Sequence, residues 1–236
     1  MIAALDHLVV GGSAAPYETL LGRRAVDGHL RTGNVGLRFE PGASGLRSMV
    51  FATQDLDKAA TLLERRAVAT TTTDASLALL GHGVAIGVVA QADEAPSPFT
   101  ADTASAVSSL DHVVVRTPNP ERAIAFYAGR LGLDLRLDRS NPKWGARLLF
   151  FRCGDLVVEI AHDLKKGVSD EPDYLWGLSW RVPNIGAAQA RLKAAGLDVT
   201  EPRDGRRPGS QVCTVKTGTG SVPTILIGGI ERWQGG

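Results

Sequence analysis

The chain has 236 residues, of which 44% are apolar and 22% charged, and its formal net charge is +1. This is an ordinary globular composition with room for one large or two small domains. A nearly neutral chain has no electrostatic attraction to nucleic acid or to a membrane surface. No apolar run approaches the ~20 residues that span a bilayer, and the N-terminus lacks the basic region of a signal peptide. We therefore expect a cytoplasmic protein with no nucleic-acid or membrane partner, whose cysteines, Cys153 and Cys213, are reduced and buried.

A short motif repeats along the chain. The apolar stretch that begins Leu5-Asp6-His7 is matched by Leu110-Asp111-His112, and Arg116–Pro120 recurs in altered form at 181–185. A weaker copy runs from 46 to 56. Each copy is a strand-like run that leads into a helix-like segment. The repetition predicts four copies of one structural module.

The first half contains two short modules, at about 5–40 and 46–90. A truncated helix is expected over Ala14–Gly22, and a clearer one over Leu56–Arg66. The Ala/Ser/Thr/Pro-rich stretch near 91–109 has no periodicity and is predicted to be a linker. We therefore expect an N-terminal domain over 1–92, a linker over 93–108 and a C-terminal domain over 109–236.

The second half shows the module pattern more fully. Asn119 and Pro120 predict the start of a helix that ends at Gly132. Strands are expected over 134–138, 147–152 and 155–162, then over 174–182. A helix is expected over 184–195, followed by strands over 198–201, 211–217 and 222–227. The predicted fold class is α+β, with four βαβββ modules.

This arrangement resembles the vicinal oxygen chelate superfamily, which includes glyoxalases, extradiol dioxygenases, epimerases and bleomycin-resistance proteins. The resemblance is strongest over Leu110–His162 and covers nearly the whole chain. It implies tandem cupped mixed sheets, each built from two modules. It also implies a divalent metal held by residues of the first and last strands of the modules, with substrate oxygens completing the coordination.

The resemblance points to His112 and Glu159 as metal ligands in the C-terminal cup. An imidazole and a carboxylate suit Zn, Mn, Fe or Ni. A buried acid within Leu-Val-Val-Glu-Ile-Ala needs a metal, an arginine or water. The alternative is that Glu159 pairs with Arg147 or Arg181 and that His112 is a hydrogen-bonded core histidine. In that case no metal is bound.

The other ligand positions depart from the family pattern. Gly177 stands where a second His112 is expected, and Ile225 stands where a second Glu159 is expected. In the first half His7 is present, but Arg38 and Ser48 occupy other ligand positions. We expect the first half to be a scaffold that supports the second half or a homodimer contact. A triad of His7, His112 and Glu159 is a further alternative, which requires modules one and three to share a cup.

Several residues are predicted to bind substrate. Strand alternation places Arg116, Ser179 and Arg181 on the faces that carry the ligand positions. The turn residues Lys143, Trp144 and Arg207 are expected at the rim, to bind a carboxylate or stack on a ring. The leading hypothesis is a metal-dependent small-molecule enzyme, a lyase, isomerase or dioxygenase. The competing hypothesis is a metal-free protein that sequesters an aromatic or antibiotic-like ligand, because glycine and isoleucine at ligand positions leave an apolar pocket.

Overall fold

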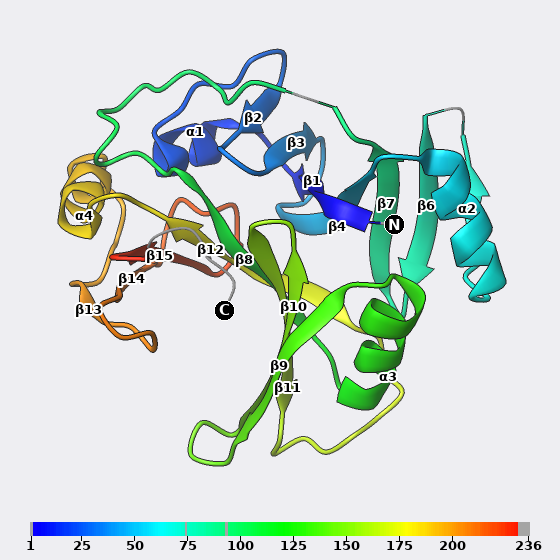
Figure 1. The fold of residues 1–236 in the computed structure, drawn as a ribbon. Helices are drawn as coiled ribbons and strands as arrows, with labels where there is room; N and C mark the ends of the chain where they lie inside the picture. The colour runs from blue at the N-terminus through cyan, green and yellow to red at the C-terminus, as the bar shows by residue number, and fades with distance from the viewer. Residues whose placement is uncertain (1, 74, 93, 231–236) are drawn as a thin grey trace. The chain divides into compact units, whose positions relative to one another are not determined.

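The computed structural model describes residues 2–73, 75–92 and 94–230. Residues 231–236, at the end of the predicted second domain, lie outside this part of the chain. The protein contains two mixed β-sheets and few helices, so the predicted α+β class is confirmed (Figure 1). Within the described ranges, no helix combines the length and the apolar character needed to cross a membrane.

The seven-stranded sheet comes from the first half of the chain and has the order β2-β3-β1-β4-β7-β6-β5. Its strands are β1 (Ile2–Gly11), β2 (His29–Arg31), β3 (Gly36–Glu40), β4 (Gly45–Thr53), β5 (Thr71–Thr72), β6 (Ser76–Gly81) and β7 (Val84–Ala90). The eight-stranded sheet comes from the second half and has the order β13-β14-β15-β12-β8-β11-β10-β9. Its strands are β8 (Ser109–Arg116), β9 (Asp134–Asn141), β10 (Ala146–Cys153), β11 (Leu156–Asp163), β12 (Tyr174–Arg181), β13 (Arg203–Asp204), β14 (Gln211–Val215) and β15 (Thr224–Gly228). The domain boundaries themselves stay a prediction.

The helices begin where the repeated motif places a capping side chain. They are α1 (Ala15–Leu21), α2 (Leu56–Arg65), α3 (Pro120–Ile124), which continues into the π-helical turn η1 (Ala125–Arg130), and α4 (Ile185–Ala194). The side-chain oxygens of Asp55, Asn119 and Asn184 each accept a hydrogen bond from a backbone N–H three residues on. Helix α1 has Ala14 at this position and no side-chain cap, and it is shorter than α2 and α4.

Three local expectations differ from the structure. The predicted helix over 119–132 is helical, but its second half widens into a π-turn. No strand spans 198–201; Val199 forms a single bridge to Val215, and the strand β13 begins four residues later. The predicted linker is packed rather than loose, because Ala106 and Val107 are fully buried. Periodicity alone does not report these features, since each depends on contacts made elsewhere in the chain.

The first of two compact units contains residues 1–7, 47–93 and 113–176. In it, α2 lies beside β6 and β7, and α3 packs against β10 and β11 (Figure 1). The aromatic rings of Tyr127 and Phe151 meet between α3 and the sheet, with centroids 5.7 Å apart. Phe126 packs so closely on the tip of the β6–β7 hairpin that a Cβ at Gly81 would lie 2.5 Å from its ring. A side chain at residue 81 would therefore require the Phe126 ring to shift.

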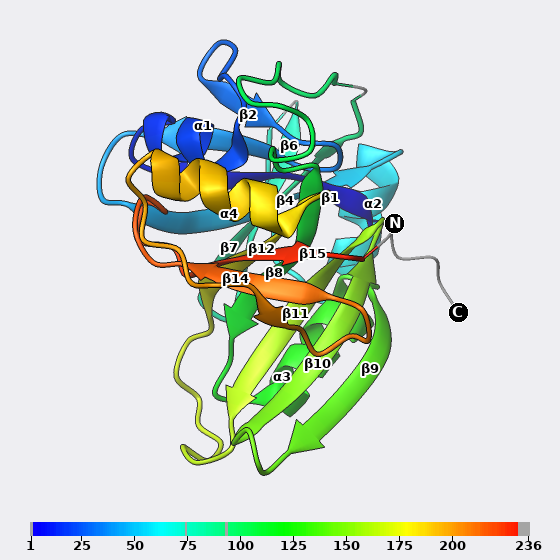
Figure 2. The same cartoon turned by 90° about the vertical axis from the view of Figure 1, so that its left-hand side faces the viewer.

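The second unit contains residues 8–46, 94–112 and 177–236. Helix α4 packs against β14 and β15 (Figure 2), and Trp180 of β12 is fully buried. Arg191 of α4 donates hydrogen bonds to the carbonyls of Thr19 and Leu20 at the end of α1. Residues 94–108 run across this unit, where the guanidinium of Arg23 binds the carbonyls of residues 97 and 107. This explains the burial of the predicted linker: its carbonyls satisfy a buried cation.

Both thiols are free and buried, as predicted. Burial raises the pKa of the Cys153 thiol to about 12. Burial likewise raises the pKa of Cys213, to about 11. A thiol with such a pKa is almost entirely protonated near neutral pH, so neither residue is an activated nucleophile.

A buried ion pair fastens the segment after β11 in the first unit. The Asp173 carboxylate is 2% exposed and accepts hydrogen bonds from Arg122 and from the Thr117 hydroxyl, both at 2.7 Å. The Arg122 guanidinium also binds the carbonyls of Asp170 and Glu171. One arginine of α3 therefore organises the chain from 170 to 173.

We expect Arg122→Met to lower the free energy of unfolding by about 3 kcal/mol, because it leaves the Asp173 carboxylate buried without its cation. Arg130→Met is the matched control: Arg130 is exposed about two turns further along the same helical segment, and its replacement should cost less than about 0.5 kcal/mol. Urea denaturation of the three proteins measures both values. Equal losses in the two variants would show that the ion pair is not what fastens the segment.

Candidate functional site

A chain of three hydrogen-bonded side chains links β8 and β12 in the second unit. The Asp111 carboxylate lies 2.8 Å from Nδ1 of His112, and Nε2 of His112 lies 2.7 Å from the Ser179 hydroxyl. An ionised carboxylate can only accept, so Nδ1 carries a hydrogen. In the neutral ring, Nε2 then presents its lone pair, and the hydroxyl of Ser179 donates to it. The arrangement selects one tautomer of His112 and fixes the direction of the Nε2 lone pair.

Two arginines keep the Asp111 carboxylate ionised. Its Oδ1 accepts from Nε of Arg181 at 2.9 Å and from Nη1 of Arg207 at 3.4 Å. Burial by itself raises the pKa of Asp111. The hydrogen bond from His112 and the charges of Arg207 and Arg181 outweigh it, so the pKa lies well below its usual range. The carboxylate is 1% exposed, and it is therefore a permanent negative charge in the interior of this unit.

The structure gives a steric reason why β12 carries no ligand at the position expected to match His112. A Cβ at Gly177 would lie 2.8 Å from the backbone carbonyl oxygen of Pro223, which already accepts a hydrogen bond from Leu178. Any side chain there would push β12 and β15 apart. Ile225, at the other expected position, is paired with Ser179 in the parallel register of these strands. Neither position supplies a donor atom.

Glu159 lies in the first unit, on the face of β11 that is turned away from α3. It is partly buried and stands opposite Phe150 in the antiparallel register of β10 and β11. Arg147, one of the cations considered as its partner, instead binds Asp138 through two nitrogens and Glu121 through the third. His162 is on the other face, where its Nδ1 meets the Thr117 carbonyl at 3.1 Å.

The predicted substrate-binding residues fall into two groups. In the first unit, Arg116 stacks over Trp176, and Trp144 lies under Arg139, while Lys143 is exposed in the β9–β10 turn. In the second unit, Ser179, Arg181 and Arg207 all belong to the hydrogen-bonded group around Asp111. Arg181 is 5% exposed, so it is part of the interior rather than of a rim.

Sequence reasoning did not assign roles to Asp111 and Arg139. For Asp111 a signal was present: an aspartate precedes the histidine in both copies of the opening motif. In the first half, the Asp6 carboxylate also holds Nδ1 of His7, at 2.6 Å, and both residues are buried. For Arg139 there was no signal, because the spacing of residues does not show which aromatic ring an arginine covers. His7 lies in the seven-stranded sheet and His112 in the other, so the sheet order does not support a triad that includes both.

Among the residues with a described position, no three His, Cys, Asp or Glu side chains form a group that could by itself hold a metal ion.

Comparison with known proteins identifies the second half. Residues 111–214 match the family model described as the glyoxalase/bleomycin resistance protein/dioxygenase superfamily. This part of the chain is a vicinal oxygen chelate domain. Its 109-residue match to the ethylmalonyl-CoA/methylmalonyl-CoA epimerase of Cereibacter sphaeroides is 28% identical and covers 42% of this chain and 81% of that enzyme.

The fold of the vicinal oxygen chelate proteins extends over the whole chain. BphC, a halotolerant catechol dioxygenase, superposes with a TM-score of 0.76 at 13% identity, over 98% of this chain and 88% of that one. The Mn(II)-bound glyoxalase of Novosphingobium aromaticivorans gives a TM-score of 0.73 at 14% identity, over 98% and 83% of the two chains. At these identities the likeness establishes the fold and leaves the reaction open.

Asp111→Asn tests the electrostatics of the vicinal oxygen chelate domain. A carboxyl whose pKa is depressed on folding stabilises the protein above its unfolded pKa, about 3.9, and loses that contribution as the pH falls towards its folded pKa. We expect the variant to be less stable than the wild type by about 3 kcal/mol at pH 7, with a difference that shrinks below about pH 4. Urea denaturation between pH 2.5 and 7 measures this.

The matched control for that measurement is Asp134→Asn. Asp134 forms an ion pair with Arg136 in which both side chains are substantially exposed, so its loss should change stability little. A difference between Asp111→Asn and wild type that stays constant across the pH range would contradict the assignment of Asp111 as a buried, ionised carboxylate.

Proposed function

We propose that the chain is an enzyme of the vicinal oxygen chelate type that acts on a small molecule, with His112 at its reacting centre. The observation that carries the proposal is the fixed imidazole: Asp111 holds Nδ1, and Nε2 keeps its lone pair. A carboxylate that orients a histidine in this way is the usual outer partner of a metal-binding or proton-transferring imidazole.

We further propose that His112 and Glu159 bind a divalent metal, as the sequence predicts. The donor chemistry fits in part. A neutral imidazole with its outer nitrogen held by Asp111 is a good ligand, and a partly buried carboxylate is another. Because Gly177 and Ile225 provide no donor, the shell must include oxygens of the bound molecule. Such a metal, Fe, Mn, Zn or Ni, would supply Lewis-acid stabilisation of negative charge on a substrate oxygen.

The residues around His112 have defined tasks in this proposal. Asp111 keeps the hydrogen on Nδ1, and Arg181 and Arg207 keep Asp111 ionised. The Ser179 hydroxyl donates a hydrogen bond to Nε2 on the other side of the ring. Rotation about the Cα–Cβ bond of Ser179 would redirect this hydrogen bond to an incoming group. The site is thus preorganised before a substrate arrives, which reduces the reorganisation needed during reaction.

Among lyase, isomerase and dioxygenase chemistry, we propose the isomerase class. Support comes from the epimerase relative, of which this chain covers 81%. Epimerisation next to an acyl carbonyl removes a proton from that carbon and returns one to the opposite face. The dioxygenase neighbours share the fold at low identity and do not favour one reaction.

A metal-free binding protein is the second candidate, and the crowding at Gly177 favours it. The close approach of the Pro223 carbonyl removes space for a ligand side chain, and Nε2 of His112 already has a hydrogen-bond donor in Ser179. The same residues would then orient a bound small molecule without catalysis.

Metal loading separates the two candidates. Wild type, His112→Ala and Glu159→Ala are stripped with chelator, dialysed against Mn²⁺, Fe²⁺, Zn²⁺ or Ni²⁺, and analysed for metal per chain. We expect wild type to bind one of these ions and both variants to bind it about tenfold or more weakly. His7→Ala is the matched control and should load as wild type does. No loading by wild type, or unchanged loading in both variants, would favour the binding protein; loss in His7→Ala would revive the three-residue alternative.

The isomerase class is tested by hydrogen exchange. Methylmalonyl-CoA is incubated with protein in D₂O, and deuterium at the carbon beside the thioester carbonyl is followed by NMR. We expect the wild type to accelerate the exchange over the protein-free rate and His112→Ala to lose most of the acceleration, because removing the oriented imidazole disrupts the reacting centre. An exchange rate equal to that without protein would count against this reaction while leaving the metal result untouched.

A further inference from the structure

Exposed apolar side chains gather at one end of the first unit, and we call this group the tip patch. Its members come from the β9–β10 turn, the segment after β11 and the start of β12, and their exposed fractions lie between 38% and 66%: Trp144, Leu164, Val168, Tyr174 and Trp176. The described ranges expose four other large apolar side chains, which are Val26, Leu80, Phe99 and Leu137. Single exposed apolar residues need no explanation, but a contiguous group marks a surface that contacts something outside the chain.

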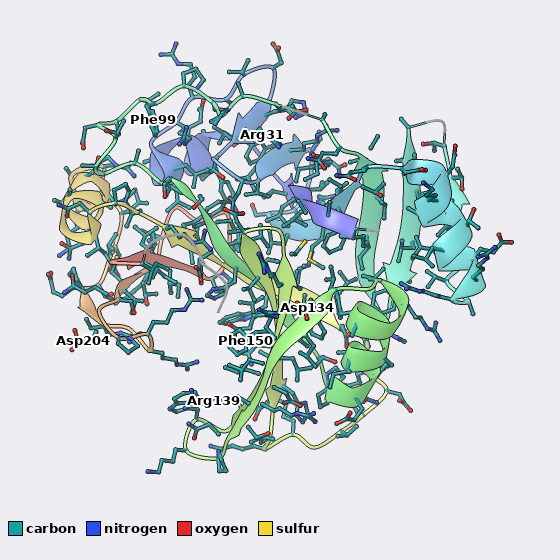
Figure 3. All side chains as sticks on the ribbon, in the orientation of Figure 1. Arg31, Phe99, Asp134, Arg139, Phe150 and Asp204 are labelled. Atoms are coloured by element: carbon teal, nitrogen blue, oxygen red, sulfur yellow. The ribbon has the colours of Figure 1, made fainter. Side chains whose placement is uncertain are left out.

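Backbone and ring contacts bring the segments of the tip patch together. Strand β10 is antiparallel to both β9 and β11, so the β9–β10 turn and the end of β11 lie at the same end of the sheet. The backbone N–H of Leu164 donates to the Gly145 carbonyl at 2.9 Å. Arg116, at the end of β8, stacks over Trp176. Figures 1 and 2 show the turn and the segment after β11 projecting from the unit in the same direction, and Figure 3 shows Arg139 towards this end of β9.

The lysines of the chain are divided between two kinds of surroundings. Three of the six form an ion pair with a carboxylate. The other three, Lys143, Lys165 and Lys166, are exposed and form no ion pair within the described ranges. All three belong to the turn and the segment that carry the tip patch. The unpaired lysines and the exposed apolar side chains therefore occupy one end of one unit.

The other charges at this end reinforce the positive potential. Arg139 stacks over Trp144, with its guanidinium carbon 5.0 Å from the ring centroid. Asp163 is partly buried, and its Oδ1 accepts from the backbone N–H of Lys165. The acids at 170 and 171 lie at the far end of the segment, where their carbonyls bind Arg122 of α3.

We propose that the tip patch docks the protein on an anionic lipid surface. Tryptophan and tyrosine side chains favour the boundary between water and the acyl chains of a bilayer. Leu164 and Val168 would be buried just below the headgroups, and the three lysines would lie among the lipid phosphates. The net charge of +1, from which no membrane partner is expected, averages over the whole chain and does not report a local cluster of cations.

The shape and composition of the tip patch favour lipid over a protein partner. Its side chains come from a turn, an extended segment and the start of a strand rather than from one continuous face. A protein partner would need a surface that matches this uneven end. The headgroup region of a bilayer is fluid and adapts to projecting side chains. This inference does not rest on the proposed function, because it requires neither a metal nor His112.

Co-sedimentation of the full chain with vesicles tests the proposal. The vesicles contain phosphatidylcholine alone or phosphatidylcholine with one quarter phosphatidylglycerol. We expect the wild type to bind the anionic vesicles about tenfold or more tightly than the neutral ones, with an affinity that falls as salt is added. Lys165→Gln/Lys166→Gln and Leu164→Ser/Val168→Ser should each weaken binding to the anionic vesicles about tenfold, because one loses the lipid phosphates and the other the apolar burial.

Two control variants match these changes elsewhere in the chain. Lys58→Gln/Lys216→Gln removes two exposed lysines that pair with carboxylates, and Val26→Ser/Leu80→Ser removes two exposed apolar side chains. Both should bind the anionic vesicles as wild type does. Near-UV circular dichroism verifies that every variant is folded.

The orientation on the bilayer is measured by tryptophan quenching with lipids brominated on the acyl chain. We expect quenching in the wild type and its loss in Trp144→Phe/Trp176→Phe. Several results would overturn the proposal: no binding to anionic vesicles, equal binding to neutral ones, or equal losses in the tip and control variants. Quenching that survives the double tryptophan variant would also overturn it. So would a wild-type dimer that Leu164→Ser/Val168→Ser converts to monomer while vesicle binding is unchanged, because the tip patch would then belong to a second copy of the chain.

Discussion

The buried carboxylate of Asp111 is the constraint on which the candidate site depends. An isolated charge at 1% exposure would cost several kcal/mol, so the fold must bring donors to it. Those donors come from β8 itself, from β12 and from the segment before β14, through His112, Arg181 and Arg207. Satisfying one charge therefore fixes the register of two strands, the course of a loop and the tautomer of the histidine. The orientation of the His112 ring follows from this electrostatic requirement. The ring is therefore oriented without a bound ligand.

Local packing also accounts for a difference between the opening strands of the modules. Both copies of the opening motif keep an aspartate bonded to the following histidine, so the local geometry is inherited. The fourth module has no room for a side chain at residue 177, because a Cβ there would lie 2.8 Å from the Pro223 carbonyl oxygen. A ligand could not be placed there by one substitution, since the backbone spacing would have to change as well. The absence of a ligand side chain at residue 177 is therefore coupled to the packing of β12.

Much of the fold was predictable because it follows from short-range chemistry. The caps at Asp55, Asn119 and Asn184 mark three helix starts, and strand alternation correctly placed Glu159 opposite the helix side of its sheet. The features that escaped prediction arise between segments distant in sequence. The burial of residues 94–108 depends on Arg23, the π-turn after α3 contacts the β6–β7 hairpin, and the role of Asp111 appears only when Arg181 and Arg207 converge on it. Periodicity reports which face a residue occupies, but not which charge it meets there.

The contacts of the arginine side chains distinguish those that stabilise the fold from those available to a ligand. The spacing of the arginines in the sequence does not make this distinction. Arg23 and Arg191 bind backbone carbonyls, while Arg122 and Arg181 neutralise buried carboxylates, and each of these contacts holds distant segments together. A guanidinium used in this way has fewer donors left for a ligand. Arg116 and Arg139 are held by aromatic faces alone, an arrangement that positions the group without consuming its hydrogen bonds. Arg116 is partly buried and Arg139 is exposed, and stacking of such a cation on an aromatic ring contributes only about 0.5 to 1 kcal/mol at an exposed site.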